Sequence, residues 1–360
     1  MANTNLTAAK KAKNDEFYTQ YPDIQKEIQA YVDYNPDVFK GKTILLPCDD
    51  PEWSNFTRFF AQNFERFGLK KLISTSYAVE SKLYKYGYQI TAFEESAPQY
   101  DRDKTRTKGK IFTLTRDISG DGKIDVDDLE WDYLEGDGDF KSEEVMALRD
   151  EADFIITNPP FSLFRDFLAW IIEAKKQFAI IGNMNAITYK EVFPLIKENK
   201  MWLGATGNTT DMVFAVPEGT EVDEKDRQKA ARLGYVGDYT RLGNSCWFTA
   251  IDHGKRHEPL QLMSMADNKR FNKKLQKKEN AYSRYDTYNA IEVPFTDAIP
   301  KDVVGVMGVP ISFLDKYNPN QFEIIGIDRY VEDNPNYGKR FTINGNEIYA
   351  RILVKHKDII

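Results

Sequence analysis

Residues 152–182 read ADFIITNPPFSLFRDFLAWIIEAKKQFAIIG, and this stretch decides the fold class. The apolar run at 152–157 predicts a buried strand, residues 163–175 have the apolar spacing of an amphipathic helix, and residues 178–182 predict another strand. The same alternation extends in both directions along the chain. Further strands are predicted at 42–48, 71–77, 88–93, 110–115, 201–205 and 246–251, and helices at 53–67, 142–151 and 188–199.

Apolar strands that alternate with helices are typical of a parallel sheet covered on both faces. We therefore expect an α/β protein with a mostly parallel, seven-stranded, Rossmann-like sheet, helices on both faces and a smaller C-terminal unit. Ligands of such sheets bind beyond the carboxyl ends of the strands, so chemistry is expected in the loops that follow strands. The pattern changes near residue 253. This change predicts a catalytic domain at 1–260, and a basic arm with the C-terminal unit at 261–360.

The composition narrows the class of protein. Of 360 residues, 41% are hydrophobic and 29% charged, as in globular proteins. No apolar run reaches the roughly 18 residues that cross a bilayer, and the N-terminus has no apolar leader, so we expect a cytoplasmic protein without a membrane partner. Cys48 and Cys246 form no spaced framework, and the three histidines show neither Ser-His-Asp nor zinc-type spacing, which argues against hydrolytic and zinc chemistry.

The formal net charge of −7 argues mildly against a nucleic-acid partner, but a local basic cluster matters more for an enzyme that uses one face. Such a cluster lies at 269–278. Its members are Lys269, Arg270, Lys273, Lys274, Lys277 and Lys278. The cluster is either a solvated face or linker, or a surface that contacts phosphate groups.

The residues Asn158-Pro159-Pro160-Phe161 directly follow the predicted strand at 152–157. They suit the methylation of a planar amino group, whose lone pair is delocalised into its ring. The side-chain oxygen of Asn158 and the backbone carbonyl of Pro159 can accept the two amino protons, so that the lone pair points at a sulfonium methyl group. The prolines fix the backbone, and Phe161 offers a flat face to a flipped-out base. A plain strand-to-helix turn is the alternative.

Several motifs resemble those of the EcoRI-type adenine-specific DNA methyltransferases. Residues 158–161 resemble motif IV of amino-methyltransferases, residues 15–20 resemble their motif X, and Gly138-Asp139-Phe140 resembles their motif III. Similarity to the EcoRI type itself lies at 46–51, 54–56, 158–164, 181–189 and 343–351. The resemblance therefore extends from about residue 14 to residue 355.

The resemblance implies an enzyme that transfers a methyl group from S-adenosylmethionine to N6 of a flipped adenine in a specific site of double-stranded DNA. It implies that the catalytic residues are Asn158, Pro159, Pro160 and Phe161. It also implies that the cofactor is bound by Phe17, Tyr18, Thr19, Pro47, Cys48, Asp49, Asp50, Ser76, Asp139 and Phe140. We expect a monomer or weak oligomer, with a cognate restriction endonuclease as a candidate partner.

Two features depart from the usual methyltransferase pattern. The strand at 42–48 is followed by no glycine-rich loop, and no acidic residue for the ribose hydroxyls is evident after Ser76. Asp49 and Asp50 either hold the methionine ammonium group or cap a helix. Asp139 either accepts a hydrogen bond from the cofactor adenine or belongs to a plain acidic turn.

Residues 117–128 fit the spacing of a twelve-residue calcium loop, with a glycine at position 6. The candidate ligands are Asp117, Ser119, Asp121, Lys123, Asp125 and Asp128. Position 12 is Asp instead of Glu, and a predicted strand stands in place of the entering helix. An acidic surface hairpin is therefore the alternative, and a bound calcium ion would have a structural role.

Two other functions remain open from the sequence. Methyltransferases that act on RNA or on protein glutamine share the Asn-Pro-Pro motif, because an amide or base amino group poses the same chemical problem. A DNA-binding protein with an inactive methyltransferase fold is the other alternative. The recognition sequence depends on contacts to base edges that no residue spacing reveals.

Overall fold

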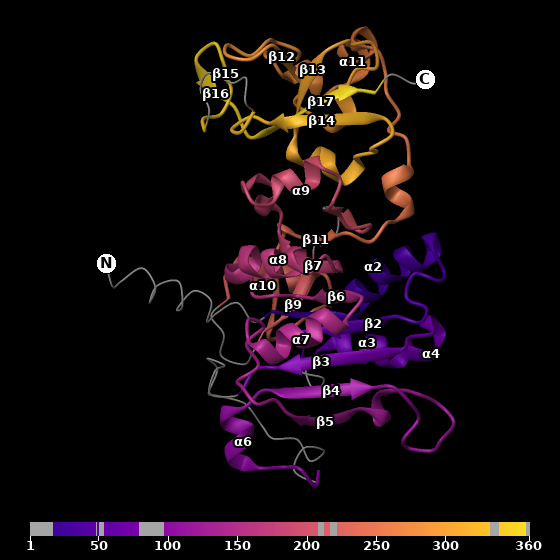
Figure 1. Cartoon of the computed structure of the whole chain (residues 1–360). Coiled ribbons are helices and arrows are strands. Elements are labelled where there is room, and N and C mark those ends of the chain that lie inside the picture. Colours follow the sequence, from indigo (N-terminus) through magenta and orange to yellow (C-terminus); the bar gives the residue numbers. More distant parts are fainter. Residues whose placement is uncertain are drawn as a thin grey trace. The chain divides into compact units, whose positions relative to one another are not determined.

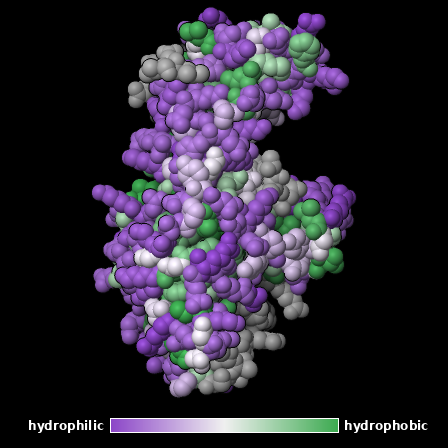
Figure 2. Space-filling model, turned by 90° about the vertical axis from the view of Figure 1, so that its right-hand side faces the viewer, coloured by the Kyte–Doolittle hydropathy of each residue, from purple (hydrophilic) through white to green (hydrophobic). Residues whose placement is uncertain are grey.

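The computed structural model describes residues 17–47, 49, 54–78, 97–207, 212–216, 222–331 and 338–357. The chain forms two compact units, one of Met1–Asn183 with Thr209–Ile251 and one of Met184–Asn208 with Asp252–Ile360 (Figure 1). Hydrophilic residues predominate on the face shown in Figure 2, where hydrophobic residues occur in small groups. Among the described residues, no helix is both long enough and apolar enough to cross a membrane.

The large sheet has eight strands, and its direction is mixed. Their order is β5 (Glu130–Tyr133), β4 (Lys110–Leu114), β3 (Lys71–Ser76), β2 (Thr43–Leu46), β6 (Phe154–Thr157), β7 (Gln177–Asn183), β11 (Ser245–Thr249) and β8 (Trp202–Leu203). The four strands from β3 to β7 are parallel, while β4, β5 and β11 pair antiparallel with their neighbours. The expected α/β class is confirmed, but seven mostly parallel strands are not found, because an apolar run does not encode strand direction.

Helices α2 (Tyr21–Tyr34), α3 (Asn55–Gln62) and α4 (Phe64–Phe67) cover one face of this sheet. Their apolar side chains form the main core with alternate strand residues, which include Ile44, Ile156 and Ile181. The Ser54 hydroxyl caps α3 by accepting a hydrogen bond from the Phe56 backbone N–H, and Gly68 ends α4 in the left-handed conformation. The helix predicted at 53–67 is thus found as two shorter helices.

Helices α7 (Glu143–Glu151) and α8 (Phe164–Glu173) lie on the opposite face (Figure 1). The Phe164 ring is 5.1 Å from the ring of Phe248, which points away from the main core. A side chain at Gly182 would come within 2.4 Å of the Phe164 ring, so glycine is required where α8 approaches β7. Helices therefore cover both faces, as the sequence predicts.

Three smaller sheets and four further α-helices complete the described strands and α-helices. In the first unit, β1 (Tyr18–Thr19), β9 (Val213–Ala215) and β10 (Tyr239–Arg241) form a three-stranded sheet, accompanied by α6 (Arg102–Thr107) and α10 (Glu224–Arg232). The second unit contains the sheet β12 (Ala290–Glu292), β13 (Val306–Pro310), β17 (Arg351–His356) and β14 (Phe322–Ile327), the hairpin β15 (Thr342–Ile343) and β16 (Asn346–Glu347), and the helices α9 (Phe193–Lys197) and α11 (Met265–Phe271).

One local prediction differs from these elements, and two others concern residues 88–93 and 269–278. The helix predicted at 188–199 is shortened to α9, and the strand candidate at 88–93 lies outside the described residues. Within the predicted basic arm, residues 269–271 lie in α11, residues 275–277 form a 3-10 turn, and Leu275 is buried. The arm itself stays a prediction.

Candidate active site

The Asn158-Pro159-Pro160 segment leaves β6 at the edge where the parallel strands end. Pro159 is buried, whereas Asn158 and Pro160 are half-buried. Phe161 begins a 3-10 turn that leads into α8. The two fixed proline φ angles hold this loop extended before the turn, so the motif occupies the position expected for a ligand site.

Asn158 is oriented by the N-terminal part of the chain. Its Nδ2 donates a 2.7 Å hydrogen bond to the backbone carbonyl of Phe17, so its Oδ1 is presented as an acceptor. This Oδ1 is buried and has no hydrogen-bond partner within the described part of the chain. A buried polar atom without a partner costs about 1–3 kcal/mol of stability. An acceptor kept in this state is therefore expected to bind a hydrogen-bond donor of a ligand.

Three phenylalanine rings lie beside Asn158. The Phe161 ring centroid is 5.8 Å from that of Phe17 and 6.5 Å from that of Phe214, and Phe17 and Phe214 are 5.9 Å apart. Phe214 is fully buried, whereas Phe161 and Phe17 are half-buried. The cluster thus holds the Phe161 ring in place and leaves part of it available for stacking.

Strand β1 joins two of the predicted motifs. Thr19 pairs with Phe214 of β9, and the Nδ2 of Asn55 in α3 donates a 2.8 Å hydrogen bond to the Thr19 carbonyl. Thr19 Oγ1 is buried and is another atom without a partner among the described residues. Asn55 lies in the stretch 54–56 that carries the resemblance, but it was given no role. Phe214 was missed, although the apolar run at 212–216 is the kind of signal that predicts a strand.

The segment that carries Asp139 lies beside the carboxyl end of β3. The Ala78 backbone N–H donates to the Asp137 carbonyl at 2.8 Å, and a side chain at Gly138 would come within 2.4 Å of the Ser76 carbonyl. Thr75 Oγ1 and Ser76 Oγ are buried there without a hydrogen-bond partner in the described residues. The structure therefore brings Ser76 and Asp139 to one place and adds Thr75 to it.

Asp139 and Phe140 differ in their availability to a ligand. One carboxylate oxygen of Asp139 accepts a 2.9 Å hydrogen bond from the Lys141 backbone N–H. The Phe140 ring is 2% exposed, with its centroid 5.1 Å from that of Phe167 and 5.6 Å from that of Trp170. Phe140 therefore anchors this loop to α8.

Asp49 links the ends of β2 and β6. Its buried carboxylate accepts a 2.7 Å hydrogen bond from the Ser54 hydroxyl. The Thr157 hydroxyl lies within hydrogen-bond distance of the other Asp49 carboxylate oxygen and of the Pro47 carbonyl. Ser54, and not Asp49, caps α3. Asp49 thus fixes the residue that precedes Asn158, while Cys48 and Asp50 lie outside the described residues.

The loop at 117–128 does not support the expected calcium site. Asp117 accepts hydrogen bonds from the backbone N–H groups of Gly120 and Gly122, and Asp128 accepts from those of Ile118, Ser119 and Asp125. In the described part of the chain, no group of three or more acidic, His or Cys side chains is placed to hold a metal ion. The alternative, an acidic surface hairpin, fits better, because the loop connects the antiparallel pair β4 and β5 and its carboxylates accept hydrogen bonds from its own backbone.

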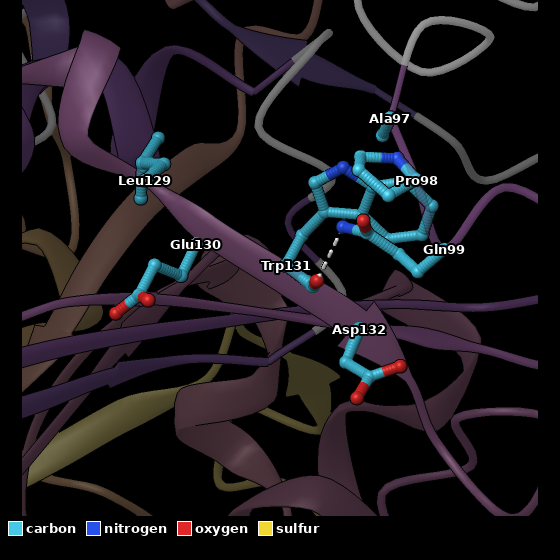
Figure 3. A pocket seen from close by; sticks show the side chains of 7 residues that line it. All are labelled: Ala97, Pro98, Gln99, Leu129, Glu130, Trp131 and Asp132. Carbon is cyan, nitrogen blue, oxygen red and sulfur yellow. Dashed lines mark hydrogen bonds between the residues drawn. The ribbon is translucent and has the colours of Figure 1, made fainter. Parts of the chain in front are cut away.

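A cavity of about 530 Å³ lies beside the edge strand β5 (Figure 3). The Gln99 Nε2 donates a 2.8 Å hydrogen bond to the Trp131 carbonyl at this cavity. The carboxylates of Glu130 and Asp132 project from the other side of the strand (Figure 3). None of the predicted site residues lines this cavity.

Comparisons with known proteins point to one family. The profile described as adenine-specific methyltransferase EcoRI matches residues 5–357. The chain is 41% identical over 356 residues to the Type II methyltransferase M.EcoRI of Escherichia coli, covering 99% of this chain and 97% of that relative. It is 31% identical to the Type II methyltransferase M.MpnI of Mycoplasma pneumoniae over 97% of each chain, and 32% identical to M.MgeORF184P of Mycoplasma genitalium over 99% of each. No solved structure matches significantly.

Proposed function

The chain belongs to the family of EcoRI adenine-specific methyltransferases, and on this premise we propose that it transfers a methyl group from S-adenosylmethionine to N6 of an adenine in double-stranded DNA. The adenine must leave the base stack to reach the loop after β6, at a cost of a few kcal/mol. The observation that carries the proposal is the buried, unpaired Oδ1 of Asn158 beside the half-buried Phe161 ring.

Two oxygen atoms of the motif contact the adenine amino group, and one ring contacts the base. Asn158 Oδ1 accepts one amino proton in a hydrogen bond, and the Pro159 carbonyl accepts the other. With both protons so held, the nitrogen becomes more tetrahedral, and its lone pair is less delocalised into the ring and free to accept a methyl group. Bound S-adenosylmethionine would supply the methyl group and would leave as S-adenosylhomocysteine, and the nitrogen would afterwards lose one proton to solvent. Phe161 stacks on the base and keeps the nitrogen in line.

Several described residues fit S-adenosylmethionine, which supplies the electrophilic methyl group when bound. Thr19, Thr75 and Ser76 offer buried hydroxyl groups that lack partners among the described residues. Gly138 lets the Asp139 segment approach the end of β3. In this proposal Asp139 contacts the cofactor adenine, and Phe17, Tyr18 and Thr19 line the methionine side.

Asp49 has two roles in the proposal. It attracts the cofactor ammonium group, and its hydrogen bond with Thr157 holds the start of the motif loop. Pro47 contributes its carbonyl to the same link. Cys48 and Asp50 complete the cofactor loop.

The test is methyl transfer from labelled S-adenosylmethionine to duplex DNA, RNA and protein in parallel. We expect label in duplex DNA only, at N6 of adenine. Label in RNA or protein and none in DNA would contradict the proposal. Cofactor and DNA binding without turnover in any substrate would instead support an inactive methyltransferase fold. Sequencing the methylated DNA then identifies the recognition site.

The remaining parts of the proposal concern setting and partners. The enzyme acts in the cytoplasm as a monomer or weak oligomer, and the second unit contacts the DNA duplex. A restriction endonuclease that cleaves the same site is the proposed partner, as the Type II names of the relatives suggest. Loss of cleavage by that endonuclease after methylation is the direct test.

A further inference from the structure

The second unit contains a cavity of about 670 Å³, a size suited to a group as large as a nucleotide. Its lining combines the segment 184–188 with residues around β13 and the start of β17. Four cationic residues, Lys278, Arg329, Arg340 and Arg351, are among those that line it. Cationic residues from separate parts of the chain thus line the same cavity.

The four cations differ in how they are used. Arg351 forms an ion pair inside the protein, because its Nη2 lies 2.6 Å from the buried carboxylate of Glu292. Arg329 and Arg340 are half-buried, and no described residue forms a hydrogen bond or ion pair with either guanidinium group. The carboxyl of Asp328 is close enough to interact with both electrostatically. Among the residues that the structure describes, one acid beside two arginines and an exposed lysine leaves excess positive charge at the cavity.

The basic cluster at 269–278 is organised differently. Lys274 lies 3.5 Å from the Asp297 carboxylate, and the Lys269 ammonium group lies 5.7 Å from the centre of the Tyr282 ring. The side chains of Lys273 and Lys277 are exposed. Exposed lysines attract DNA without fixed geometry, whereas two half-buried arginines present rigid planar donors that match phosphate oxygens.

We propose that this cavity binds a backbone phosphate of the DNA duplex, with Arg329 and Arg340 donating to its oxygens. Lys278 adds charge at the rim, and Tyr349, whose side chain is 80% exposed, packs against the neighbouring deoxyribose. This inference rests on the proposed function, since it assigns the protein surface that holds the substrate. Such contacts set the register of the duplex without reading its sequence.

The test compares two double variants of the full-length protein that remove equal charge. The first is R329Q with R340Q, and the control is K273Q with K277Q in the basic cluster. Affinity is measured by fluorescence anisotropy across a salt series, with a short labelled duplex that contains the recognition site with its target adenine unmethylated. We expect the arginine variant to bind about 30-fold more weakly and the slope of log Kd against log salt to fall by about 2, with less than about threefold change in the control.

Further measurements separate this inference from the proposed function. Methylation of DNA by the wild-type protein tests the proposed function alone. In the arginine variant, we expect the loss to fall mainly on the KM for DNA and less on kcat. Thermal unfolding checks that the variant folds, and R329K with R340K, which keeps the charge and loses the planar fork, should restore the salt slope but not the full affinity.

Three outcomes would overturn the inference. One is equal weakening in the arginine variant and the lysine control. Another is an unchanged salt slope in a folded arginine variant. The third concerns a free anion as the ligand: inorganic phosphate binding that the arginine substitutions abolish, with DNA affinity unchanged, would assign the cavity to a small anion.

Discussion

The loop after β6 and the loop at 117–128 both carry a sequence motif, yet they use their polar groups in opposite ways. In the first, Asn158 has one amide atom fixed by Phe17 and leaves the other buried without a partner among the described residues. In the second, the carboxylates of Asp117 and Asp128 accept hydrogen bonds from the backbone of the same loop. This difference indicates that a ligand-binding loop leaves hydrogen-bond acceptors available to the ligand, whereas in a structural turn the acceptors bind the backbone of the turn itself.

The largest effect is expected for Asn158→Ala. Removing the acceptor should lower kcat by about 10²–10³-fold, or about 3–4 kcal/mol, because the amino group loses one of two hydrogen bonds in the transition state. Cofactor affinity should stay within a few fold by calorimetry. The melting temperature should fall by a few degrees at most, because loss of the hydrogen bond to the Phe17 carbonyl is partly offset by removal of a buried Oδ1 that lacks a partner among the described residues. Near-normal turnover would refute the mechanism.

A smaller effect is expected for Phe161→Leu, which keeps apolar volume and removes the flat face. Stacking of a base on an aromatic ring contributes about 1–3 kcal/mol, so kcat/KM for DNA should fall about tenfold or more. Phe271→Leu is the matched control, because Phe271 is 58% exposed in the second unit. Equal losses in steady-state assays of the two variants would show that Phe161 has no special contact with the substrate.

Asp23 in α2 carries a partly buried carboxyl group that is not among the predicted site residues. Burial raises the pKa of Asp23 to about 6, against weaker lowering by Lys26 and by the Val213 backbone N–H. The raised folded pKa means that its contribution to stability is present below pH 4 and is lost as pH rises through 6. Asp23→Asn should therefore stabilise the protein at pH 8 by ~1–2 kcal/mol, after screening, and have little effect at pH 4. Denaturant unfolding at both pH values measures this, and equal changes would contradict it.

The smallest effect is expected in the acidic loop. Hydrogen bonds from the backbone N–H groups of Ser119, Asp125 and Ile118 lower the pKa of Asp128 to about 2. Its stabilising contribution is present above about pH 4 and is lost as pH falls toward 2. Asp128→Asn should lower the melting temperature by at most a few degrees at pH 7 and leave methylation unchanged. A melting temperature that rises with millimolar calcium in the wild type, and not in the variant, would restore the metal-site interpretation.

Elements whose pattern lies in one contiguous stretch could be predicted from the sequence. The strand at 152–157, its motif and the helix that follows are in that class, because apolar spacing and proline chemistry act locally. The directions of β4, β5 and β11 could not be predicted, because antiparallel and parallel strands share apolar runs. Phe214 and Thr75 were missed, and Asn55 was given no role, because only the fold brings these residues to the predicted site. The calcium spacing misled because aspartate and glycine favour both metal loops and tight turns.

The hydrogen bond between Asn158 and the Phe17 carbonyl spans 141 positions of the chain. Contacts of such separation require closure of a long loop and are among those that slow folding. The acceptor for the amino group is therefore oriented only after the segment at 17–20 has docked, so refolding kinetics should show core formation before activity. A chain cut between residue 20 and α2, supplied with the missing segment as a separate peptide, would report on this step through recovery of methyl transfer.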